Sequence, residues 1–258
     1  MNPYFSIVMP VKNGENVIAE AIDTIIEQFY ENWELIVVND HSADKTADIV
    51  REYKDARIKL FDLPEAETGI SSGRDFGNKK AKADIIVVAD ADDWNYANRL
   101  QDTIDYFYAH PDTDVFYGNI DLYYEDTKEL KTRWFQNFDA ELLKHINFIP
   151  NVGTAYKKDA YFSVSGYDKS LDMSEDYDLW LQFLEAGKKF GCVNKSFVKV
   201  RMHASSIRGK NPNTLREVIN IVRKKHELEV SEDQIKKLAN KEVYEYFTSD
   251  KKRKTWIE

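Results

Sequence analysis

The chain has 258 residues, a formal net charge of -9, 43% apolar and 31% charged residues, and a single cysteine, Cys192. These values fit one large globular domain, or one domain with a small appendage, and exclude disordered, collagen and coiled-coil classes. The lone cysteine excludes an internal disulfide framework and a zinc cluster built on thiolates, and the acidic balance argues against nucleic-acid binding.

No apolar run approaches the roughly 18 residues of a membrane-spanning helix, and the N-terminus lacks the basic-then-apolar pattern of a signal peptide. We therefore expect a cytoplasmic protein. The net charge is -12 over residues 1–208 and +3 over residues 209–258. A basic cluster at residues 251–254 beside Trp256 is interpreted as a solvated tail, with a weak peripheral contact to the inner face of a membrane as the alternative.

The first half of the chain alternates strand and helix patterns. Short apolar, β-branched runs predict strands at 5–9, 35–38, 57–61 and 84–89, the third nearer a sheet edge. Apolar residues at helical spacing predict helices at 15–29, 43–53, 72–82 and 96–108, with Ser42 as the cap of the second. This alternation predicts βαβ units, and therefore a mostly parallel central sheet flanked by helices on both faces.

The second half is less regular. Strand patterns occupy 115–117, 120–124 and 153–156. Helices are predicted at 159–163, from about Asp176 onward, at 214–228 and at 231–247. We expect the irregular stretch 119–150 to hold contacts to an acceptor substrate.

Short clusters that contain polar residues follow three of the predicted parallel strands, at the end where such sheets bind ligands. They are Pro10, Val11 and Asn13 after the first strand, Asn39, Asp40 and Ser42 after the second, and Asp90, Asp92 and Asp93 after the fourth. No Gly-x-Gly-x-x-Gly or phosphate-loop signature follows the first strand, which argues against ordinary Rossmann and P-loop proteins.

The acidic segment Asp90-Ala91-Asp92-Asp93 follows a strand that has almost no charge. Three carboxylates within four residues repel one another unless they are solvated or neutralised by a cation. Oxygen ligands of this kind suit Mg²⁺ or Mn²⁺ bridging to a phosphate-bearing substrate. From the charge pattern alone, a metal site and a solvated turn remain equally open.

An ordered set of motifs resembles the inverting family 2 glycosyltransferases of the GT-A fold. The matching segments cover residues 6–13, 37–46, 69–78, 90–93, 166–168 and 174–180, within a match of about 5–205. The resemblance implies a GT-A nucleotide-diphospho-sugar transferase fold: a catalytic domain at 1–208 and a helical C-terminal extension at 209–258. Within the domain, it implies a nucleotide-binding half at 1–110 and a half for the acceptor and catalytic base at 111–208.

The resemblance also implies the residues that bind the donor. Asp40 would accept a hydrogen bond from the nucleotide base, usually uracil in this family, and Pro10 with Val11 would lie against that base. Arg74 would contact the nucleotide or its diphosphate, and Asp90 would touch the ribose.

For the chemistry, the resemblance implies Asp92 as a ligand of Mn²⁺ or Mg²⁺ and Asp176 as the general base. His203, in a segment similar to the family's Arg-x-His-x-x-Ser, would complete the metal shell or contact phosphate, with a surface histidine that has no ligand as the alternative. Supporting roles would fall to Asn13, Asp93, Glu175, Arg201 and Arg208. A carboxylate can take the proton of an acceptor hydroxyl, and a cation can stabilise a leaving diphosphate, so these assignments fit the chemistry.

The predicted function is metal-dependent transfer of a sugar from a nucleotide-diphosphate donor to a hydroxyl of a glycan or lipid-linked glycan, and the resemblance implies a UDP-sugar as the donor. One alternative is a sugar-phosphate nucleotidyltransferase, although residues 11–15 lack its Gly-rich basic loop. The other is a catalytically inactive nucleotide- or glycan-binding module, although Asp92 and Asp176 are both present.

Overall fold

The computed structural model describes residues 4–133, 135–171, 173–202 and 212–249. The strands are β1 (Phe5–Val11), β2 (Trp33–Asn39), β3 (Ile58–Asp62), β4 (Ile85–Val88), β5 (Trp94–Asn95), β6 (Val115–Tyr124), β7 (Glu129–Thr132), β8 (Thr154–Lys157) and β9 (Phe190–Met202). The helices are α1 (Ile18–Ile26), α2 (Thr46–Glu52), α3 (Ile70–Lys80), α4 (Arg99–Ala109), α5 (Ala140–His145), α6 (Lys158–Phe162), α7 (Glu175–Glu185), α9 (Pro212–Lys225), α10 (Glu232–Leu238) and α11 (Lys241–Thr248), with a 3-10 turn at Asn151–Gly153.

These strands form one sheet in the order β3-β2-β1-β4-β8-β6-β9-β5, with β7 paired to β6. Strands β3, β2, β1 and β4 are parallel to one another, as the alternating pattern predicts. Strand β8 pairs antiparallel to both β4 and β6, and β9 is parallel to β6. In the described part of the chain, six strands therefore run in one direction and β5, β7 and β8 in the other, so the sheet is mixed but mostly parallel.

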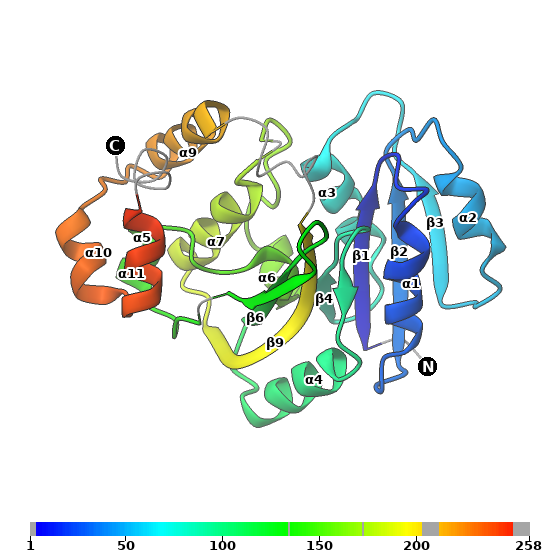
Figure 1. Ribbon diagram of the computed structural model, residues 1–258, viewed down its shortest axis with the longest axis horizontal. Helices are drawn as coiled ribbons and strands as arrows, with labels where there is room; N and C mark the ends of the chain where they lie inside the picture. The colour runs from blue at the N-terminus through cyan, green and yellow to red at the C-terminus, as the bar shows by residue number, and fades with distance from the viewer. Residues whose placement is uncertain (1–3, 134, 172, 203–211, 250–258) are drawn as a thin grey trace.

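Alternate residues of the parallel strands enter two separate cores, because successive side chains of a strand point to opposite faces. Ile7, Leu35 and Val37 pack with the apolar stripes of α1 and α4. Val8 and Val38 pack on the other face, in a core that also holds residues of α5, α7, α9, α10 and α11. The C-terminal helices thus share a core with the sheet, and Figure 1 shows them at the opposite end of the molecule from α2 and β3.

Helix α3 lies close against β1 because two of its residues lack a side chain. A Cβ atom at Gly77 would lie 2.4 Å from Val8 Cγ1, and one at Gly73 would lie 2.9 Å from Pro10 Cβ. These glycines reduce helix propensity, yet the helix forms over nearly the predicted range. The close approach brings Arg74, between the two glycines, to the carboxyl ends of the strands.

Three sequence-based expectations differ from the structure. Ser42 does not cap α2, which begins after Lys45 without a side-chain cap; its hydroxyl instead accepts a hydrogen bond from the Asn13 N–H. The patterns at 115–117 and 120–124 belong to one strand, β6. The predicted helix at 231–247 is two helices, because the backbone is extended at Ala239 and Asn240, and the Asn240 side chain caps α11 by accepting from the Val243 N–H.

Strand β3 ends the sheet, as predicted from its alternating pattern. Among the described residues, no helix has the length and apolar character needed to cross a bilayer.

Candidate active site

A cleft of about 870 Å³ opens at the carboxyl ends of the parallel strands. The predicted site residues in the described part of the chain all line it: Pro10, Val11, Asn13, Asp40, Arg74, Asp90, Asp92, Asp93, Glu175, Asp176 and Arg201. His203 and Arg208 lie outside the described residues. The fold therefore gathers side chains that are up to 191 positions apart in the sequence around one cleft.

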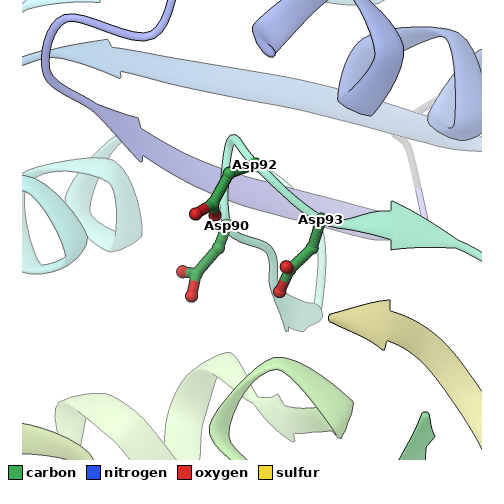
Figure 2. A group of neighbouring side chains, drawn as sticks. All are labelled: Asp90, Asp92 and Asp93. Atoms are coloured by element: carbon green, nitrogen blue, oxygen red, sulfur yellow. The ribbon is translucent and has the colours of Figure 1, made fainter. Parts of the chain in front are cut away.

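The acidic segment forms a turn after β4 in which the three carboxylates project to the same side (Figure 2). Asp90, Asp92 and Asp93 each offer an oxygen, and these oxygens lie within 4.8 Å of one another. Asp93 is buried and the other two are half-buried. Several hard oxygen ligands this close together are the donor set that Mg²⁺ and Mn²⁺ prefer, so these residues fit such an ion.

Arg201 holds this turn through both its backbone and its side chain. The Arg201 N–H donates to Asp93 Oδ1 at 3.0 Å, and Arg201 Nε donates to the Asp92 carbonyl at the same distance. The Arg201 guanidinium also pairs with Glu20 and Glu125 and stacks over Trp94, 3.8 Å from the ring centroid. Arg201 therefore contacts the acidic turn at both Asp92 and Asp93.

Arg99 lies buried behind the same turn and donates to the Val88 carbonyl at 2.9 Å. Burial lowers the pKa of the Arg99 guanidinium to about 9. The carboxylates of Asp93 and Asp90 act to raise this pKa, but burial outweighs them. This guanidinium is a positive charge beneath the acidic cluster that sequence analysis did not single out. Arg99 is the first residue of α4, and no sequence motif marks it as a site residue.

Arg74 joins the acidic turn to α7. Its guanidinium donates to Asp90 Oδ1 at 2.7 Å and to Glu175 Oε1. Burial disfavours the charged guanidinium, but the ion pairs with Asp90 and Glu175 outweigh burial and raise its pKa above the ordinary value. Burial also raises the pKa of Glu175, and Arg74 offsets this only in part. Arg74 therefore stays cationic between two carboxylates.

Asp176 occupies the first turn of α7, after Ser174 in the left-handed region at φ 59°. Its Oδ1 accepts from the Tyr177 N–H at 2.8 Å, and its Oδ2 accepts from Asn147 Nδ2 at 3.1 Å. Asn147 also lines the cleft. No sequence motif marks this asparagine, which belongs to the irregular stretch in which acceptor contacts were expected.

Asp40 lies at the other end of the predicted donor site and is buried. It accepts hydrogen bonds from Thr68 Oγ1 at 2.9 Å, from the Gly69 N–H at 3.0 Å and from Lys12 Nζ at 3.3 Å. Burial raises the pKa of this carboxyl, but these hydrogen bonds outweigh burial, so the pKa lies below its usual value. Lys12 and Thr68 line the cleft as well, and sequence analysis missed both.

Asn13 joins the loops that follow β1 and β2. Its side-chain oxygen accepts from the Ala43 N–H at 2.8 Å, and its own N–H donates to Ser42 Oγ at 2.9 Å. Its backbone φ of 54° lies in the left-handed region, which asparagine tolerates better than most residues. The side chain thus fixes the loop that carries Pro10 and Val11 beside the one that carries Asp40.

The amino-acid sequence of the chain is similar to those of glycosyltransferases. The model of the family described as glycosyl transferase family 2 matches residues 6–169. An uncharacterized glycosyltransferase of Rickettsia typhi is 30% identical over 226 residues, which cover 84% of this chain and 69% of that protein. The UDP-Glc:alpha-D-GlcNAc-diphosphoundecaprenol beta-1,3-glucosyltransferase WfgD of Escherichia coli is 30% identical over 205 residues and covers 78% of each. The chain therefore belongs to glycosyl transferase family 2 and is a nucleotide-sugar glycosyltransferase.

Solved structures match its fold. Staphylococcus aureus TarS 1–349 in complex with UDP-GlcNAc has a TM-score of 0.71 and 17% identity, covering 95% of this chain and 72% of that one. The mannosyltransferase PcManGT from Pyrobaculum calidifontis, in complex with GDP-Man and Mn²⁺, has a TM-score of 0.69 and 15% identity, covering 96% and 71%. At these identities the likeness concerns the fold, and it confirms the predicted GT-A architecture.

Proposed function

We propose that this glycosyltransferase moves a sugar from a UDP-sugar to a hydroxyl of a glycan or lipid-linked glycan, with inversion at the anomeric carbon and with Mn²⁺ or Mg²⁺. The observation that carries the proposal is the presence of the acidic turn and Asp176 in one cleft. The WfgD relative, named for a UDP-glucose donor and a diphosphoundecaprenol-linked acceptor, supports the donor and acceptor classes.

The donor would lie along the half of the cleft built by β1, β2 and β4. Asp40 would accept from the base, Pro10 and Val11 would pack against it, and Asp90 would bind the ribose. Lys12 donates to Asp40 Oδ2 at 3.3 Å and would hold this carboxylate in place beside the base. Arg74, fixed between Asp90 and Glu175, would supply a positive charge toward the diphosphate.

Asp92, with Asp90 and Asp93, would hold the metal ion, because these residues present three carboxylate oxygens together. Bound there, the divalent ion would neutralise charge that develops on the leaving diphosphate. The region of His203, the other predicted metal ligand, lies outside the described residues.

Asp176 would act as the general base. The acceptor hydroxyl oxygen bonds to the anomeric carbon while the bond from that carbon to the diphosphate oxygen breaks. The hydroxyl proton goes to Asp176, and UDP leaves with the electron pair. Because Asp176 is held by Asn147 and begins a helix, its carboxylate has a fixed position from which to take the proton.

The test is a donor screen that measures nucleotide release with Mn²⁺ and with EDTA, starting from UDP-glucose and an N-acetylglucosaminyl diphospholipid acceptor. We expect metal-dependent UDP release coupled to a new glycosidic product. Asp176→Asn should keep UDP affinity and lose about 10²- to 10⁴-fold in kcat. Asp159→Asn is the matched control, because Asp159 is an exposed acid in the first turn of another helix, α6.

An Asp176→Asn enzyme with full transfer activity would remove Asp176 from the role of base. Release that is equal in Mn²⁺ and in EDTA would remove the metal from the mechanism. Consumption of a sugar phosphate with a nucleoside triphosphate would instead identify a nucleotidyltransferase.

A further inference from the structure

The C-terminal extension forms part of the wall of the catalytic cleft. Leu215 of α9 and Tyr246 and Phe247 of α11 line the same cleft as Asp176. Ile149 and Met173 line it as well. These five residues are apolar or aromatic, and Arg133 and Asn147 add polar groups to the same lining, whereas the residues assigned to the donor are largely charged. A sugar ring has apolar C–H faces and a polar rim, and pockets for such ligands combine aromatic surfaces with a few polar groups.

Helix α11 has a fixed position on the catalytic domain. The Asn240 N–H donates to Gln136 Oε1 at 2.8 Å, and Asn240 Nδ2 donates to the Phe135 carbonyl. The same side chain caps α11 at the Val243 N–H, and both Val243 and Phe247 are fully buried. One residue thus joins the start of α11 to the segment between β7 and α5.

Within this fixed helix, Tyr246 is more exposed to solvent than its neighbour Phe247. Phe247 is fully buried in the core shared with α5 and α7, whereas Tyr246 is only half-buried. Contacts of the Tyr246 ring include the edge-on Phe247 ring, with 5.1 Å between centroids, and the Arg133 guanidinium, which lies over the Tyr246 ring, 5.7 Å from its centroid. An aromatic ring with its orientation fixed and part of its surface accessible is suited to stack against a ligand ring.

We propose that Tyr246 is a stacking surface for a pyranose ring of the acceptor, and that the C-terminal extension thereby belongs to the acceptor-binding site. This inference rests on the proposed function, because the acceptor hydroxyl must reach Asp176 in the same cleft. It assigns to α11 a role in acceptor affinity that is separate from donor binding at Asp40 and the acidic turn.

The experiment compares three variants on the donor and acceptor pair named above. Tyr246→Ala removes the ring, and Tyr246→Phe keeps it. Tyr244→Ala is the matched control, since Tyr244 is a half-buried tyrosine of the same helix that packs on the core and is not part of the cleft lining. Acceptor KM, UDP affinity in Mn²⁺ and thermal unfolding are measured for each.

We expect Tyr246→Ala to raise the acceptor KM about tenfold while UDP affinity is unchanged. Tyr246→Phe should keep an acceptor KM close to that of the unmodified chain, as should Tyr244→Ala. An unchanged acceptor KM in Tyr246→Ala, or an equal rise in Tyr244→Ala, overturns the assignment. A rise in Tyr246→Phe equal to that in Tyr246→Ala also overturns it, since the ring is retained.

The same measurements distinguish failure of the Tyr246 stacking role from failure of the proposed function. If the unmodified chain transfers sugar and Tyr246→Ala matches it, only the stacking role is wrong. If the unmodified chain releases no nucleotide from any donor with any acceptor, the proposed function is wrong, and the inference is overturned with it.

Discussion

The side-chain amide of Asn147 donates a hydrogen bond to Asp176 Oδ2 across 3.1 Å. A carboxylate oxygen can only accept, so this contact orients the amide nitrogen toward Asp176 and holds the carboxylate against rotation. Asp176 Oδ1 is occupied by the adjacent Tyr177 N–H. The proposed base is therefore fixed at both oxygens before a substrate arrives.

Removing the Asn147 amide should slow sugar transfer without weakening donor binding. We expect Asn147→Ala to lower kcat about tenfold, because the Asp176 carboxylate gains freedom and leaves its productive orientation. UDP affinity should stay unchanged. Steady-state kinetics and UDP titration check this, with Asn220→Ala, an exposed asparagine of α9, as the control. A fall in UDP affinity equal to the fall in kcat would assign Asn147 to the donor site instead.

Arg74 should be essential to stability as well as to donor binding. Its removal in Arg74→Ala leaves Asp90 and the buried Glu175 without their shared cation. Loss of one partner from a buried ion pair costs about 3–5 kcal/mol. We expect that loss in the free energy of unfolding in urea.

Arg74→Lys should recover only part of the lost unfolding free energy, because a single ammonium cannot reproduce the forked contact to two carboxylates. Arg51→Ala is the control, since Arg51 pairs with Asp48 on the exposed face of α2. An unfolding free energy equal to that of the unmodified chain in Arg74→Ala would contradict the buried network.

Gly77 should resist substitution even though alanine favours helices. A Cβ atom there would lie 2.4 Å from Val8 Cγ1 and 3.3 Å from Val38 Cγ2, so α3 would have to move away from the sheet. We expect Gly77→Ala to destabilise the fold by about 1–3 kcal/mol, which exceeds the gain in helix propensity of about 1 kcal/mol. Urea unfolding measures the change, and Lys80→Ala on the same helix is the control. A stabilised Gly77→Ala protein would show that the contact relaxes at no cost.

The attachment of α9 to α7 should depend on pH. His226 Nε2 lies 2.9 Å from Asp178 Oδ1, and its Nδ1 lies 2.7 Å from Glu185 Oε1. Burial lowers the pKa of His226, but these two carboxylates outweigh burial and raise it above its usual value. The protonated ring therefore stabilises the fold fully below the pKa of the unfolded chain, about 6.5. This contribution is lost as the pH rises through the higher pKa of the folded state.

Urea unfolding of the unmodified chain and of His226→Gln at a series of pH values tests this dependence. The difference in unfolding free energy should be largest at about pH 6 and should shrink as the pH rises through the raised pKa of the folded state. A difference that does not change with pH would show that His226 acts without its charge.

At low pH the contacts among Asp178, Lys225 and His226 should also lose stability, in this case because the Asp178 carboxylate becomes protonated. Burial raises the pKa of Asp178, but His226 and Lys225 outweigh burial, so its pKa lies below the usual value. The stability it contributes is present above the unfolded pKa and disappears as the pH falls through the folded one.

The parallel strands and the residues at their carboxyl ends were predictable because both signals are local. A run such as that of β2 is buried on both faces, and Asp40 and Asp90 follow their strands directly. Topology then brings these ends to one edge of the sheet. Asn240 carried a local signal too, since asparagine favours helix caps, but the continuous apolar spacing around it obscured the break.

Other site residues depend on tertiary contacts that no local pattern encodes. Asn147 reaches Asp176 across 29 positions, and Thr68 reaches Asp40 across 28. Tyr246 reaches the cleft on a helix that Asn240 joins to the segment at 135–136 and that Val243 and Phe247 pack into the core. The motif resemblance singled out the residues that we propose to bind the donor, whereas the proposed acceptor wall could be identified only in the folded chain.

The division of the sheet into two cores has a consequence for re-engineering the enzyme. In the described part of the chain, the core beneath α1 and α4 contains no residue of α9, α10 or α11, whereas the opposite core combines those helices with α5 and α7. An exchange of C-terminal helices between relatives would therefore have to carry α5 and α7 with it. Under the donor and acceptor sites proposed above, β1, β2, β4 and α1 could stay unchanged while acceptor preference is transplanted with these helices as one block.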